Sequence, residues 1–137
     1  MSTTPATAAR VATTPAMQPL AVDHVQVNVT DVDRSIRFYT EHLGLTQRGD
    51  RPDFSFGGAW LNAGGQQIHF VQAPAPPNLG QHFSLLVEDI EAAITGLRDR
   101  GIEVTDAVDS AYDRQAFLSD PDGNFIELHQ RGGAAPR

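Results

Sequence analysis

The sequence predicts an α+β fold made of two tandem copies of one β-α-β-β-β unit. The first observation is an internal repeat, since a shift of 58 residues aligns HVQVNVTDVD at 24–33 with HFSLLVEDIE at 82–91. At the same offset, GQQIHF at 65–70 aligns with GNFIEL at 123–128, which favours a duplication over a chance match. The third observation is the hydrophobic periodicity of each copy, which changes from strand-like to helical and back to strand-like.

Each copy, or module, begins with a strand and then a helix. Apolar residues alternate with polar ones over 24–29, and a similar alternation covers 82–87, as in half-buried strands. Asp31 and Asp89 are good N-cap residues placed just before helical patterns. The apolar stripe of the first expected helix is Val32, Ile36, Tyr39 and Leu43. The stripe of the second is Ile90, Ile94 and Leu97, and Gly101 suits the C-cap of that helix.

Three short strands follow the helix in each module. The strand-like segments of module 1 and then of module 2 are residues 46–48, 59–62 and 67–72, then 103–105, 115–118 and 124–130. The sequence Asp-Pro-Asp-Gly at 120–123 is typical of a tight turn, so we expect it to join the last two strands.

Most of the chain belongs to one folded domain, residues 20–131. Its start is marked by a segment rich in Thr, Ala and Pro, which we interpret as a flexible N-terminal tail. The predicted division is a tail at 1–19, module 1 at about 20–73, a Pro-rich linker at 73–81, module 2 at about 82–131 and a C-terminal tail at 132–137.

Composition excludes several classes of protein. The net charge is −7, from 10 Lys and Arg against 17 Asp and Glu, which argues against binding to nucleic acid. No apolar run approaches the ~18 residues of a membrane-spanning helix, so we expect no membrane insertion. The absence of cysteine excludes disulfides, thiolate metal sites and a cysteine nucleophile, and fits a cytoplasmic protein, which is our expectation.

Strand parity predicts a metal site. If the apolar residues of the first and last strands of each module face the helix, then His24, His69, His82 and Glu127 project from the opposite, helix-free face. They occupy two pairs of equivalent positions in the repeat, and related modules could bring them to one point. Imidazole and carboxylate together suit one divalent ion, namely zinc, nickel, cobalt, manganese or ferrous iron. His129 lies on the same face and is interpreted as pocket-lining or solvated.

Two motifs resemble signatures of the vicinal oxygen chelate superfamily, which includes glyoxalase I, the bleomycin- and fosfomycin-resistance proteins and the extradiol dioxygenases. The opening motif is Asp-His-Val at 23–25 with the Leu-Gly-Leu at 43–45, and the closing motif is DPDGNFIEL at 120–128. The resemblance implies paired βαβββ modules forming a cup-shaped mixed sheet around a metal, with His24, His69, His82 and Glu127 in the metal positions. It also implies a homodimer, and leaves open whether each site lies within one chain or between subunits.

The resemblance implies an enzyme acting on a small-molecule substrate with adjacent oxygens. Glyoxalase-like lyase or isomerase chemistry is favoured, with Glu127 as a metal ligand that also moves a proton. His69 departs from glyoxalase I, which usually has a second Glu at that position. An Fe(II) extradiol-type dioxygenase is the alternative, because His24, His82 and Glu127 would make a 2-His-1-carboxylate triad. A metal-free, drug-sequestering protein of the bleomycin-resistance type is the alternative of another class.

Overall fold

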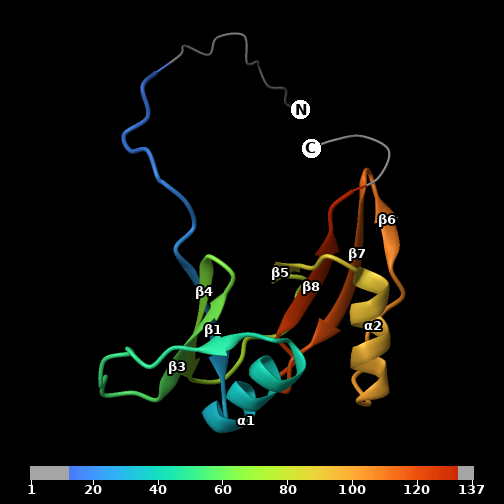
Figure 1. Ribbon diagram of the computed structural model, residues 1–137. Coiled ribbons are helices and arrows are strands. Elements are labelled where there is room, and N and C mark those ends of the chain that lie inside the picture. The colour runs from blue at the N-terminus through green and yellow to red at the C-terminus, as the bar shows by residue number, and fades with distance from the viewer. Residues whose placement is uncertain (1–12, 133–137) are drawn as a thin grey trace, which may run out of the picture.

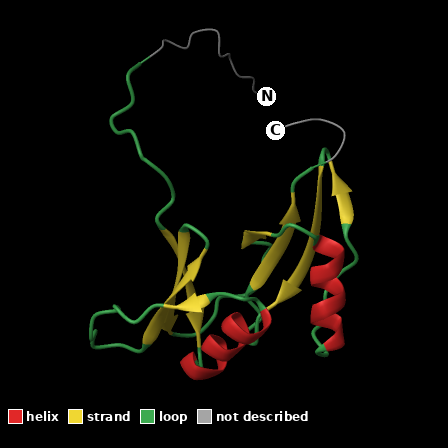
Figure 2. Ribbon diagram, in the orientation of Figure 1, coloured by secondary structure: helices red, strands yellow, loops and turns green. Residues whose placement is uncertain are grey.

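The computed structural model of the protein describes residues 13–132. It contains two four-stranded mixed sheets, each with a helix packed on one face (Figures 1 and 2). The elements of module 1 are β1 (His24–Val29), α1 (Val32–Arg37), the π-helix η2 (Phe38–His42), β2 (Thr46–Gln47), β3 (Gly58–Ala63) and β4 (Gln66–Gln72). The elements of module 2 are β5 (His82–Leu86), α2 (Ile90–Asp99), β6 (Val108–Ser110), β7 (Asp113–Ser119) and β8 (Phe125–Gln130). The predicted α+β class and the tandem modules are confirmed.

The two sheets have the same topology, and their parallel strand pairs have the same register. Their strand orders are β1-β4-β3-β2 and β5-β8-β7-β6, and in each the first strand runs parallel to the last while the inner hairpin is antiparallel. His24 pairs with Gln67 in one sheet, and His82 pairs with Phe125 in the other. Both members of the second pair follow the first by 58 residues, so the sequence repeat is a structural repeat.

The predicted N-caps form as expected. Asp31 Oδ1 accepts a hydrogen bond of 3.0 Å from the backbone N–H of Arg34, and Asp89 Oδ1 accepts one of 3.0 Å from that of Ala92. Gly101 adopts φ +80° just after α2, a left-handed conformation that ends the helix at little cost for glycine.

The first helix differs from the prediction in its last turn. The helical stripe predicted one continuous helix to about Leu43, but the α-helix ends at Arg37 and widens into a π-helical turn. Within that turn Tyr39 is fully buried, and its hydroxyl donates a hydrogen bond of 2.8 Å to Asp120. A π turn inserted in a helix is uncommon and shifts the side chains that follow it.

One predicted strand is wrong. Residues 103–105 form no strand, and the edge strand of the second sheet is β6, three residues further on. Thr105 does exchange two hydrogen bonds with Phe117, but its hydroxyl and not its carbonyl accepts the second one. Because a ladder needs alternating backbone groups, the side-chain bond ends the pairing there.

The predicted turn at 120–123 joins β7 to β8 and also fastens module 2 to module 1. Asp120 Oδ1 accepts from the backbone N–H groups of Asp122 and Asn124, which closes the turn. Asn124 then donates to the carbonyl of Asn28 at 2.9 Å, and Arg34 pairs with Asp122 at 3.1 Å. These polar contacts set the two modules at a defined angle.

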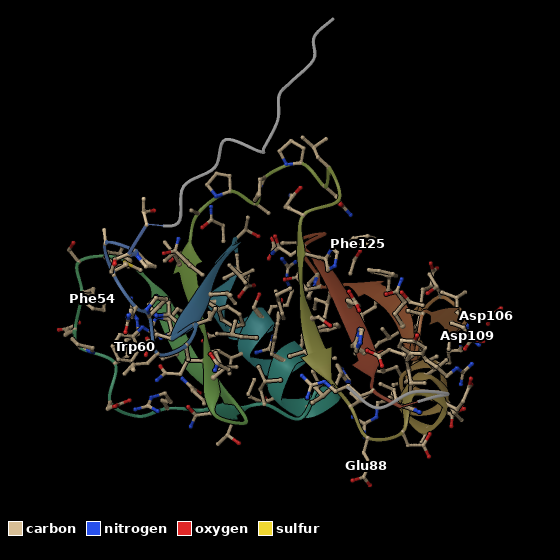
Figure 3. All side chains as sticks on the ribbon, turned by 90° about the horizontal axis from the view of Figure 1, so that it is seen from above. Phe54, Trp60, Glu88, Asp106, Asp109 and Phe125 are labelled. Carbon is tan, nitrogen blue, oxygen red and sulfur yellow. The ribbon has the colours of Figure 1, made fainter. Side chains whose placement is uncertain are left out.

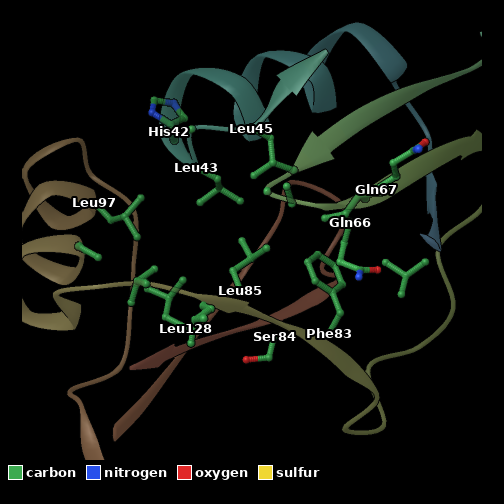
Figure 4. Close-up of a pocket in the computed structure, with 18 of the residues that line it drawn as sticks. His42, Leu43, Leu45, Gln66, Gln67, Phe83, Ser84, Leu85, Leu97 and Leu128 are labelled. Atoms are coloured by element: carbon green, nitrogen blue, oxygen red, sulfur yellow. The ribbon is translucent and has the colours of Figure 1, made fainter. Parts of the chain in front are cut away.

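A groove of about 810 Å³ lies between the helix-facing sides of the modules (Figure 4). Apolar side chains from both modules line it, including Leu43, Leu45, Phe83, Leu85 and Leu128. β1 pairs only with β4 and β5 only with β8, so within the described residues each has one unpaired edge.

The predicted tails fall largely outside the described residues, which exclude 1–12 and 133–137. The domain boundaries at 20 and 131 therefore stay predictions. None of the described helices is long and apolar enough to cross a bilayer.

Candidate metal centre

The exposure patterns of β1, β4 and β5 agree with the predicted parity of His24, His69 and His82, whereas in β8 Glu127 is buried like its neighbours. In β4, Ile68 and Phe70 are buried while His69 between them is only partly so, and in β1 the buried Val27 and Val29 leave His24 exposed. In module 2, Ile126 and Leu128 are buried in the core. Because side chains alternate across a strand, Glu127 between them points to the helix-free face.

The donors of module 1 form an aromatic stack. The ring centroids of His24 and His69 are 3.9 Å apart with 12° between the planes, and Trp60 stacks on the other side of His69 at 4.5 Å. Trp60 is opposite His69 in the β3–β4 pairing, so the hairpin register builds the stack. Phe54 and Trp60 lie at the module 1 end of the molecule, far from Asp106 and Asp109 at the other end (Figure 3).

This surrounding keeps His69 neutral. Burial lowers the pKa of His69 below its ordinary value, and the nearby charge of His24 lowers it further. Gln67 lies 2.8 Å from His69 Nε2, and Asp23 lies 2.8 Å from His24 Nδ1. A neutral imidazole oriented through one ring nitrogen is the form that binds a metal through the other.

The donors of module 2 lie in a chain of polar contacts. His82 Nε2 is 3.0 Å from Glu127 Oε1, and His129 Nδ1 is 2.6 Å from Glu127 Oε2. The other nitrogen of His129 is 2.7 Å from Asp113 Oδ2. The carboxylates of Glu127 and Asp113 are both buried, with 8% and 4% of the residue exposed.

Within these polar contacts, the pKa values of Glu127 and His129 are shifted in opposite directions. Burial alone would raise the pKa of Glu127, but hydrogen bonds from His129 and His82 outweigh it and lower the pKa below its usual value. Hydrogen bonds to Asp113 and then to Glu127 raise the pKa of His129. Glu127 is therefore held as a carboxylate, which is the form that binds a cation.

The donor set fits a divalent metal in its chemistry. Metal–ligand bonds of about 2.0–2.2 Å put neighbouring ligand atoms roughly 2.8–3.6 Å apart, depending on the coordination geometry, and His82 Nε2 and Glu127 Oε1 are 3.0 Å apart. The parallel rings of His24 and His69 must turn before a nitrogen of each can face one ion.

The two donor pairs lie in separate modules. Within residues 13–132, no three His, Asp or Glu side chains gather closely enough to hold one ion. The described chain thus presents two half-sites, which we define as His24 with His69 and His82 with Glu127.

Sequence reasoning missed the contacts of His129, Asp113 and Trp60. Once the turn at 120–123 sets the β7–β8 register, Gln115 pairs with His129, so Asp113 lies two residues along on the same face. The hairpin turn at 63–66 sets Trp60 opposite His69 in the same way. Hairpin register was the signal that could have found these neighbours.

Known proteins share this fold and sequence pattern. The family model described as the Glyoxalase/Bleomycin resistance protein/Dioxygenase superfamily matches residues 21–128. A chloroplastic lactoylglutathione lyase of Arabidopsis thaliana is 33% identical over 124 residues, covering 80% of this chain and 35% of the plant protein. The chain spans between 35% and 44% of the length of the first plant relatives it matches.

Solved structures agree with the family match. The crystal structure of a glyoxalase family protein from Bacillus anthracis is 27% identical with a TM-score of 0.74, covering 85% of this chain and 99% of that one. The antibiotic binding protein TnmS3 from Streptomyces is 28% identical with a TM-score of 0.70, again covering 85% and 99%. With its two βαβββ modules and the family model spanning both, the chain belongs to the glyoxalase/bleomycin resistance protein/dioxygenase superfamily.

Proposed function

We propose that the protein is a divalent-metal-dependent lyase or isomerase of the glyoxalase type, acting on a small substrate with adjacent oxygens. The observation that carries the proposal is the pair of half-sites at equivalent positions of the repeat, on the helix-free faces of the two sheets. His24, His82 and Glu127 would hold the ion, with His69 as the fourth ligand. The lactoylglutathione lyase name of the plant relative favours this chemistry over others in the superfamily.

Two observations support a metal centre shared between two copies of the chain. The half-sites of one chain do not gather into one group within the described residues. The unpaired edges of β1 and β5, and the apolar groove beside them, offer a surface that a second copy could cover. Modules of about 50 residues bury little surface alone, which also favours a homodimer.

The chain supplies a proton-moving group beside the ion. A bound divalent ion supplies Lewis-acid stabilisation of charge that develops on a substrate oxygen. Glu127 Oε2 accepts from His129, so Oε1 is the oxygen that would leave the ion, take a proton from one substrate carbon and return it to the neighbouring carbon.

Metal analysis of the purified protein, combined with two assays, tests the proposal. One assay follows methylglyoxal with thiol cofactors, and the other follows oxygen uptake with catechols. Zinc, nickel or cobalt with thiol-dependent turnover is the expected result. Iron with oxygen uptake would replace the lyase by a dioxygenase, and a protein that takes up no divalent metal would contradict the metal centre.

A ligand-binding role is the second candidate, favoured by an aromatic cluster next to His69. Phe54 and Phe56 are partly exposed and stacked at 5.2 Å, and the Arg51 guanidinium lies 4.9 Å from the Phe54 ring. Phe54 in turn lies 6.2 Å from Trp60. Such a surface suits a flat aromatic ligand, and the resemblance to an antibiotic binding protein agrees with it. Tight binding of an aromatic antibiotic by the metal-free protein, without turnover, would favour this role.

A further inference from the structure

Beyond the four donors, the buried Asp113 and the half-buried His129 of module 2 have a role that the proposed function does not yet use. Asp113, His129, Glu127 and His82 form one continuous line of contacts across β7, β8 and β5, at 2.7, 2.6 and 3.0 Å. The far end of the line is also anchored, because the backbone N–H of Gly132 donates to Asp113 Oδ1 at 3.3 Å.

The line restricts how the Glu127 carboxylate can turn. Both partners of His129 are carboxylates, which only accept, so both ring nitrogens donate and the ring cannot flip without losing a hydrogen bond. Its bond to Glu127 Oε2 occupies that oxygen and leaves Oε1 directed at His82. The carboxylate thereby offers one oxygen, in one orientation, on the side of the second ligand.

The repeat indicates that the strand does not need an imidazole at position 129. At the offset of 58, the position equivalent to His129 in module 1 is Val71, which occupies the same place in the last strand of its sheet. An apolar side chain therefore suffices for the strand and its pairing. The imidazole is an addition of module 2, on the side of the acidic donor.

We propose that Asp113 and His129 form a positioning pair that presents Glu127 to the metal as a one-oxygen ligand. Neither residue touches the ion: Asp113 fixes the His129 ring, and His129 fixes the carboxylate. The inference rests on the proposed metal centre and extends it to partners of the ligands. Loss of such a partner typically weakens metal affinity by about 10–100-fold, because the ligand must then be ordered by the ion itself.

Cobalt(II) titration of the purified protein tests the pair without any assay of activity. Affinity is measured by competition with a chelator, and the visible absorption spectrum at saturation reports the ligand geometry. His129→Val, the residue of module 1, removes both hydrogen bonds. His129→Asn keeps a donor near the position of Nδ1, and so restores the bond to Glu127 but not the one to Asp113.

We expect cobalt affinity to fall by about 10–100-fold in His129→Val and by less in Asp113→Asn and His129→Asn. The saturated spectrum of His129→Val should differ from that of the wild type, and that of His129→Asn should resemble it. Glu88→Gln, a change at an exposed residue of module 2 outside the half-sites and the groove, is the control. Circular dichroism confirms that each variant is folded at the temperature used.

Different outcomes separate the two proposals. If the wild type binds no cobalt, the metal centre itself is wrong and the positioning pair falls with it. If the wild type binds cobalt while His129→Val matches it in affinity and spectrum, only the positioning pair is overturned. Equal impairment of His129→Asn and His129→Val also overturns it, because the bond to Glu127 would then not be what matters.

Discussion

Module 1 presents its two donors as imidazole rings in an aromatic stack, whereas module 2 presents its two donors within a chain of charged hydrogen bonds. The scaffolds beneath them are alike, with the same strand order, the same register of the parallel strands and an aspartate cap on each helix. In module 1 His69 is held by Trp60, and in module 2 Glu127 is held by His129. The repeat thus keeps the positions of the donors, while the side chains around them differ between the modules.

The largest effect on activity should come from changing the acidic donor, Glu127. Glu127→Gln keeps the size of the side chain and one oxygen but removes the base, so kcat should fall by on the order of 10²–10⁴. Steady-state kinetics at matched metal content measure it. His69→Gln, the equivalent change in module 1, should lower kcat less, and equal losses would remove the proposed difference between the half-sites.

The second-largest difference should appear in the amount of metal that each donor variant retains. His24→Ala and Glu127→Ala should lose most of the bound metal, while His69→Ala should keep a larger share, because His69 must leave its stack to bind. Trp60 is the only tryptophan, so nickel bound at His69 should quench the intrinsic fluorescence. Nickel binding without quenching would show that His69 is not a ligand.

The two helix caps should behave alike. Asp31→Ala and Asp89→Ala each remove one hydrogen bond to a helix N-terminus, so each should lower the free energy of unfolding by about 1 kcal/mol. Chemical denaturation measures the free energy of unfolding. Asp33→Ala, a change in the first turn of α1 that leaves the cap in place, is the control for Asp31→Ala. A cap effect confined to one module would mean that the scaffolds are less alike than their topology indicates.

The smallest difference should appear in titration of the metal-free protein. NMR of the imidazoles should give His129 a pKa above 6.5 and His69 a pKa below it. The stabilisation from His129 is complete below pH 6.5 and is lost as pH rises through its raised pKa. Because burial lowers the pKa of His69, the folded protein loses stability relative to the unfolded chain as pH falls below 6.5. The reverse order of the two pKa values would contradict the contacts described.

Much of the fold could be predicted because local patterns decide it. Alternation along residues 24–29 and the cap at Asp31 depend on neighbours in sequence, and the structure agrees with both. The π turn at Tyr39 could not be predicted, because it accompanies a hydrogen bond to Asp120, 81 residues away. The strand expected at 103–105 failed for a similar reason, since pairing depends on the partner strand.

In the candidate site, too, local patterns were predictable and long-range contacts were not. Parity alone put His24, His69, His82 and Glu127 on the helix-free faces. The neighbours of those donors depend on hairpin register, so His129 was interpreted as pocket-lining or solvated and its bond to Asp113 was not expected. In the proposed shared centre the two half-sites meet across a second chain, about which a single sequence carries little physical information.

Complementation between two variants tests the shared metal centre most directly. One variant carries His24→Ala and His69→Ala, and the other carries His82→Ala and Glu127→Ala, so each homodimer lacks one half of every centre. If centres form between subunits, random re-pairing of the two should make about half the dimers mixed, each with one complete centre, and metal content should recover to about a quarter of the wild-type value. If the mixture binds no more metal than the separate variants, although subunit exchange is verified, the shared centre is wrong.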